Sequence, residues 1–150
     1  MTNPSALDRL PATLRIVPWA DPVVEAFGFG LRDPYVEEII AAHVGPTGCL
    51  FLRRVGLGFA LRPEGFSLDV AETAAALGIG STLGRNGPWW LTLGRLIRFG
   101  FARQCGTDTL AVRRVVAPLP QRAVERLPAS LQRAHGHAVA QLAGARRVAS

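Results

Sequence analysis

Residues 68–101 decide the fold of this chain and read LDVAETAAALGIGSTLGRNGPWWLTLGRLIRFGF. At the start of this stretch, Asp69 precedes an apolar stripe and is followed three residues later by Glu72, the spacing of an N-terminal capping box. Gly78 stands where a left-handed residue commonly ends a helix. We therefore predict a two-turn helix between Asp69 and Gly78.

A second helix is predicted from Pro88, a residue favoured at the start of helices, to Phe99, with Gly100 as its stop. At about 100° per residue, this segment has two different faces. The apolar residues on one arc are Trp89, Trp90, Leu93, Leu96 and Ile97. The residues on the opposite face are Leu91, Thr92, Arg95 and Arg98. The helix is therefore expected to be anchored by its tryptophans and basic on its free side.

Two short strands are predicted after this helix. The runs at 101–105 and 109–116 flank Gly106-Thr107-Asp108, a loop with glycine that is typical of a β-hairpin. The hairpin carries three arginines and one glutamine. These residues are Arg103, Gln104, Arg113 and Arg114.

The rest of the chain is expected to surround this segment. Four prolines between residues 1 and 33 prevent a long helix, so we predict an arm that packs on the body, with a short helix near 21–27. A helix begins at Asp33-Pro34, and the next, at 47–61, is apolar on nearly all sides and therefore expected to be buried. The predicted parts are an arm at 1–33, a domain at 34–116, C-terminal helices within 117–143 (about 120–127 and 129–143) and a flexible tail at 144–150.

With 150 residues, of which 49% are hydrophobic, the chain is long enough for one domain with a buried core. Cys49 and Cys105 lie in apolar runs without a metal-like spacing, which favours reduced, buried side chains. The N-terminus lacks the features of a signal peptide, and the longest weakly charged stretch, at 41–52, is too short to span a bilayer. We therefore expect a cytoplasmic protein without a membrane partner.

All 17 basic residues are arginines, and the net charge of +6 is distributed unevenly. Residues 1–72 contain six arginines and nine acids, a net charge of −3, whereas residues 73–150 contain eleven arginines and two acids, a net charge of +9. GC-rich coding would explain the absence of lysine, but arginine also suits bidentate contacts to phosphate or guanine. A polyanion would therefore meet the second half of the chain.

The order helix, short strand, helix, loop, helix, hairpin over residues 47–116 resembles the winged helix-turn-helix superfamily of DNA-binding regulators. Residues 68–79 look like its first helix-turn-helix segment, and residues 91–102 are similar to its recognition helix running into the wing. The flanking helices loosely resemble the dimer-forming additions of MarR-like regulators. The resemblance implies a mainly α (α+β) fold: a winged helix-turn-helix with a two-stranded β-hairpin wing and extra N- and C-terminal helices. The loop at 78–87 is longer than the usual turn of about 3–4 residues.

The resemblance also implies a transcriptional regulator that binds double-stranded DNA as a homodimer. The exposed face of the helix at 88–99 would enter the major groove, with Thr92 and Arg95 at base edges. The residues before this helix and the arginines of the wing would contact phosphates or a narrow minor groove. About five phosphate contacts imply a log–log salt slope of roughly −4 to −5. The candidate DNA-binding residues are Arg85, Asn86, Thr92, Arg95, Arg98, Arg103, Arg113 and Arg114.

No catalytic, cofactor or metal motif stands out in the sequence. It contains no G-x-S-x-G, P-loop or H-E-x-x-H, and the glycine pattern from Gly78 to Gly84 is one residue too long for a dinucleotide site. His135 and His137 fall on different faces of a predicted helix, and His43 is distant in sequence. We therefore expect neither an enzyme nor a bound cofactor or metal.

The alternative to DNA binding is a winged helix that binds another protein within a larger assembly. The arginines of the second half distinguish the two functions. A continuous arginine surface favours DNA, whereas arginines that scatter or pair with the N-terminal acids disfavour it. The sequence identifies no effector ligand for either function.

Overall fold

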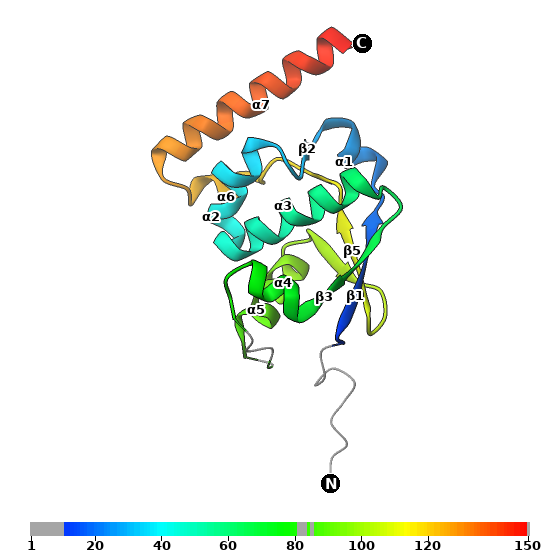
Figure 1. The fold of residues 1–150 in the computed structure, drawn as a ribbon. Coiled ribbons are helices and arrows are strands. Elements are labelled where there is room, and N and C mark those ends of the chain that lie inside the picture. The colour runs from blue at the N-terminus through cyan, green and yellow to red at the C-terminus, as the bar shows by residue number, and fades with distance from the viewer. Residues whose placement is uncertain (1–10, 81–83, 85, 150) are drawn as a thin grey trace.

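The computed structural model describes residues 11–80, 84 and 86–149 (Figure 1). It is an α+β fold in which a four-stranded mixed sheet, ordered β3-β1-β5-β4, accompanies a small two-stranded sheet. The strands of the larger sheet are β1 (Thr13–Trp19), β3 (Phe66–Asp69), β4 (Ala102–Gln104) and β5 (Thr109–Arg113). The smaller sheet pairs β2 (Phe29–Gly30) with β6 (Val115–Val116).

Strand β1 lies inside the larger sheet, between β3 and β5. Its residue Ile16 is opposite Phe66 of antiparallel β3 and opposite Leu110 of parallel β5. Leu14 and Ile16 are buried while Arg15 between them is exposed, which is the alternation of a strand with one face in the core. The N-terminal region therefore contributes a strand that separates β3 from β5.

The predicted winged helix-turn-helix fold is wrong, because β1 stands between β3 and the β4–β5 hairpin in a sheet of four strands. Residues 13–19 form an internal strand where the sequence predicted an arm packed on the body. Prolines exclude a helix here but not an extended strand. Strand β3 pairs only with residues 13–16, so Pro18 lies where β1 has β5 as its one neighbour and needs no second row of hydrogen bonds.

The helices follow the predicted order. They are α1 (Pro22–Phe27), a π-helical turn η2 (Val36–Ile40) continued by α2 (Ala41–Val44), α3 (Pro46–Leu61), α4 (Val70–Ala76), α5 (Pro88–Arg98), α6 (Gln121–Glu125) and α7 (Ala129–Ala149). Asp69 caps α4 as predicted, since its Oδ1 accepts a hydrogen bond from the N–H of Glu72 at 2.7 Å. Gly78 and Gly100 adopt φ angles of +76° and +79°, which suit the residue after a helix. Helix α7 continues past residue 143, where the sequence predicted its end.

Helix α3 runs through the middle of the molecule (Figure 1) and buries only one face. On that face, Phe51 meets Trp89 of α5 edge to face, with ring centroids 5.9 Å apart. The sequence predicted a buried helix because nearly all of its sides are apolar, but its outer leucines are exposed. These are Leu50, Leu57 and Leu61.

The two cysteines lie in different environments. Cys49 is buried on α3, as predicted. Cys105 is exposed, contrary to the prediction, because it follows β4 at the tip of the hairpin. Apolar neighbours in the sequence therefore predicted burial correctly for Cys49, which lies on a helix, but wrongly for Cys105, which lies beside a turn.

Tyr35 connects the C-terminal part of the chain to the core. Its buried ring stacks on Phe29 at a centroid distance of 3.9 Å, and its hydroxyl accepts a 2.9 Å hydrogen bond from the N–H of Leu119. The same hydroxyl lies 2.8 Å from Nδ1 of His135 on α7. Burial lowers the pKa of His135, so its ring is neutral at pH 7 and Nδ1 is able to accept the hydroxyl proton.

We predict that Tyr35→Phe lowers the free energy of unfolding by about 1–3 kcal/mol, because the buried N–H of Leu119 is left without its acceptor. Urea denaturation followed by circular dichroism measures this loss. His135→Ala is the matched comparison and should cost less, since the Leu119 hydrogen bond persists. An equal loss in both variants would contradict the role assigned to the Tyr35 hydroxyl.

Candidate functional site

Helix α5 lies at the end of the molecule opposite α7 (Figure 1) and turns one face to solvent. This arrangement agrees with the two predicted faces, except that Ile97 is 38% exposed and Thr92 is half-buried. The helix contains two arginines and no acidic residue. Its exposed residues after the first turn are Leu91, Gly94, Arg95, Ile97 and Arg98.

Neither arginine of α5 pairs with a carboxylate of the described residues. The Nη1 of Arg95 donates to the carbonyl oxygen of Val44 at 3.2 Å. The guanidinium carbon of Arg98 lies 5.8 Å from the centre of the Phe99 ring, within cation–π distance. A guanidinium has five N–H donors, so these contacts leave most of them unused. Both charges are therefore available to an anionic partner.

The last two arginines of the predicted wing are held by N-terminal acids. Arg113 donates to Oδ2 of Asp21 at 2.8 Å and to the carbonyl oxygen of Gly100 at 2.7 Å, and it stacks on Trp19 at 3.8 Å. The hydrogen bond from Arg113 is the main cause of a lowered pKa at Asp21. Arg114 pairs with Glu25 at 2.8 Å. This pairing counts against a phosphate-binding role for Arg113 and Arg114.

The remaining candidates lie beside α5 or outside the described residues. Arg103 on β4 is exposed, and its guanidinium lies 4.8 Å above the Trp19 ring without a carboxylate among its described contacts. Asn86 is exposed just before the first turn of α5. Arg85 lies outside the described residues. The structure therefore brings Arg95 and Arg98 to one helix face and leaves Arg103 on the adjoining strand.

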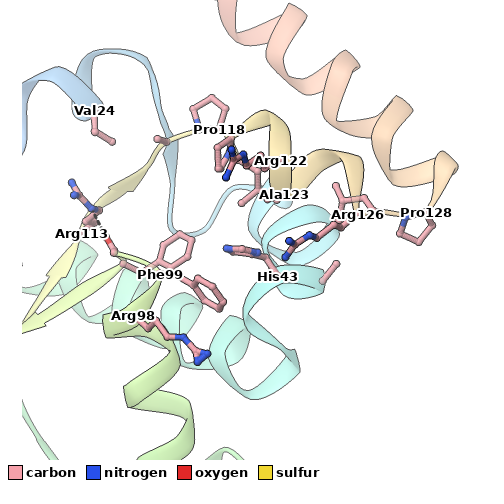
Figure 2. A pocket seen from close by; sticks show the side chains of 17 residues that line it. Val24, His43, Arg98, Phe99, Arg113, Pro118, Arg122, Ala123, Arg126 and Pro128 are labelled. Carbon is pink, nitrogen blue, oxygen red and sulfur yellow. Dashed lines mark hydrogen bonds between the residues drawn. The ribbon is translucent and has the colours of Figure 1, made fainter.

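A cavity of about 830 Å³ opens beside the C-terminal end of α5 (Figure 2). Its walls come from α2, the end of α5, the segment 117–120 and α6. Aliphatic side chains, prolines, Phe99 and Phe101 form most of the lining, and no carboxylate belongs to it. Its ionisable residues are His43, Arg98, Arg113, Arg122 and Arg126. The cavity is therefore apolar in its walls and positive in its charge.

His43 lies at the centre of this arrangement. Its half-buried ring packs against Phe99 at a centroid distance of 4.1 Å and against Phe101 at 6.4 Å. Figure 2 shows Arg126, the residue that follows α6, close to this imidazole. Burial and, secondarily, the charge of Arg126 lower the pKa of His43. The ring is therefore neutral at pH 7 and would gain a proton more readily beside a bound anion.

Sequence reasoning missed this cavity. It considered His43 only as a metal ligand and assigned no role to Arg122 or Arg126. One signal was present, because Arg122 and Arg126 are four residues apart and fall on one side of a short helix that follows Pro120. Nothing in the sequence places that helix next to His43, which is about eighty residues away.

Comparison with models of protein families, with curated proteins and with solved structures finds no match to this chain. Among the described residues, no helix is long and apolar enough to cross a membrane. In the same part of the chain, no cluster of three or more histidine, cysteine or acidic side chains is arranged to hold a metal ion.

We predict that His43 titrates below its usual pKa of about 6.5, and that Arg126→Ala moves this pKa upward by removing a nearby positive charge. The upward shift should be partial, because burial is the larger cause. Proton NMR of the imidazole as a function of pH measures it. Arg133 is an exposed arginine of α7, and Arg133→Ala should leave the titration of His43 unchanged. An equal response of both variants would contradict the effect of Arg126 on His43.

Proposed function

We propose that this protein binds double-stranded DNA through the exposed face of α5 and acts as a transcriptional regulator. The observation that supports this proposal is the pair Arg95 and Arg98, which share an exposed helix face that contains no acidic residue. Gly94 on the same face lets a partner approach the backbone closely. The proposal rests on this surface and requires no winged architecture.

The dimensions of α5 agree with groove binding. Eleven residues at about 1.5 Å each give a helix of about 16 Å, and the major groove is about 12 Å wide, enough for one α-helix. Arg95, in the middle of the exposed face, is the best placed to read a base edge, with Thr92 at the border of that face. Arg98, at the end of the helix, and Arg103, on β4, would contact phosphates.

A protein partner is the second candidate for the same surface. Leu91 is 60% exposed, and Ile97 and Phe99 are 38% and 40% exposed beside the arginines. Exposed apolar residues around an arginine are typical of protein interfaces as well. The absence of acidic residues on α5 favours DNA as the partner. DNA is uniformly negative and would be repelled by acidic side chains, whereas a protein-binding face can carry charges of both signs.

The proposal includes the oligomeric state and the location of the protein. Homodimerisation through the terminal helices stays a prediction. We also propose a cytoplasmic, nucleoid-associated location, which follows from DNA binding and not from any separate feature of the structure.

We predict that Arg95→Ala weakens binding to genomic DNA fragments by about 1–3 kcal/mol, and that Arg98→Ala reduces the log–log salt slope by about 1. Mobility-shift assays at two salt concentrations measure both effects. Arg133→Ala removes the same charge from the far end of the molecule and should leave affinity and slope close to those of the wild type.

Failure of the wild-type protein to shift DNA even at low salt would refute the proposed function. Equal weakening by Arg95→Ala and Arg133→Ala would also refute it, because binding would then depend on net charge alone. A loss caused by Leu91→Ala in a protein-binding assay, together with no shift of DNA, would favour the second candidate.

A further inference from the structure

We propose that the cavity beside α5 is a binding site for a small phosphorylated ligand with a flat ring, such as a mononucleotide. Arg122 of α6 and Arg126, the residue that follows this helix, would hold the phosphate, and His43 and Phe99 would contact the ring. This inference goes beyond DNA binding and does not depend on it, since Arg122 and Arg126 are absent from the proposed DNA surface.

The charge of the cavity requires an anionic ligand. Three of its guanidinium groups, those of Arg98, Arg122 and Arg126, form no ion pair with a described carboxylate. The acid nearest to them in sequence, Glu125, is on α6 but outside the lining and accepts a hydrogen bond from Gln121 at 3.5 Å. Positive charges that gather around a concave site without an acid attract anions strongly, because the walls of low polarity weaken the screening.

Arg113, the remaining arginine of the lining, is not available to bind a ligand. Arg113 already donates to Asp21 and to the carbonyl oxygen of Gly100, and its plane lies on Trp19. The free positive charge therefore lies on the side of the cavity formed by α6 and the end of α5. That side includes His43, so an anion bound between the segment around α6 and His43 would meet Arg122, Arg126 and the neutral imidazole.

Phosphate satisfies this donor set better than a carboxylate does. One guanidinium is enough to bind a carboxylate in a bidentate manner, whereas a phosphate monoester has three terminal oxygens and up to two negative charges. Arg122 lies on α6 and Arg126, four residues later, is the residue that follows this helix, and their like charges repel each other. A dianion between them removes that repulsion and accepts hydrogen bonds from both.

The rest of the cavity fits a flat apolar ring. Phe99 lines the cavity and is 40% exposed, and its ring is tilted by 39° against that of His43. Prolines and leucines of the segment 117–120 and of the residues that follow α6 also line the cavity. The volume of about 830 Å³ lies within the range of about 300–1,000 Å³ found for small-molecule sites.

Isothermal titration calorimetry of the full chain with phenyl phosphate and with AMP tests this site. Binding of both is expected, and the double variant Arg122→Ala/Arg126→Ala should weaken it about tenfold or more, because charge-assisted hydrogen bonds are lost. Arg133→Ala should bind as the wild type does. Thermal unfolding of the double variant checks its folding, and Arg122→Lys/Arg126→Lys, which retains the charges, should recover part of the affinity.

Two ligand controls separate the two halves of the proposed ligand. Adenosine, which lacks the phosphate, and inorganic phosphate, which lacks the ring, should each bind more weakly than AMP. Binding of AMP should also raise the pKa of His43 in the NMR titration, since a nearby anion favours the protonated ring.

Three outcomes would overturn the assignment. They are no binding of phenyl phosphate or AMP up to millimolar concentration, adenosine bound as tightly as AMP, and full affinity in the folded double alanine variant. These measurements contain no DNA, so their failure is distinguishable from failure of the proposed DNA binding.

Discussion

The insertion of β1 between β3 and β5 is the constraint on which the rest of the structure depends. Ile16 is fully buried and is opposite a residue of each neighbouring strand. Without β1, the inner edges of β3 and β5 would present unpaired backbone groups. Trp19, the last residue of β1, and Asp21 just after it hold Arg113 against the sheet. One strand from the acidic half of the sequence and the residues that follow it therefore hold a strand of the basic half in place.

This arrangement decides where positive charge remains available. The N-terminal acids neutralise Arg113 and Arg114, whereas the arginines of α5 and α6 have no carboxylate partner among the described residues. Among the arginines after residue 72, Arg95 and Arg98 lie on the exposed face of α5, and Arg98, Arg122 and Arg126 line the cavity at its end. Arg98 belongs to both places, since it lines the cavity and is exposed on α5.

The sequence predicted those features that depend on neighbours within a few residues. The cap at Asp69, the glycine that follows α4 and the outward position of Arg95 belong to this class. The order of the strands does not depend on near neighbours, because β1 and β5 pair across about ninety residues of sequence. Proline spacing excludes a long helix near the N-terminus, but the alternation of buried and exposed residues around Ile16 is what indicates a strand there. The ion pair between Asp21 and Arg113 and the approach of α6 to His43 are likewise invisible to local patterns.

Native-state hydrogen exchange of the β1 amides tests the central position of this strand most directly. The amides of residues 14–17 are predicted to exchange as slowly as those of β5, since opening either strand requires disruption of the same sheet. A peripheral arm would open independently of the core. Exchange of the β1 amides that is much faster than that of the β5 amides under native conditions would therefore contradict the account.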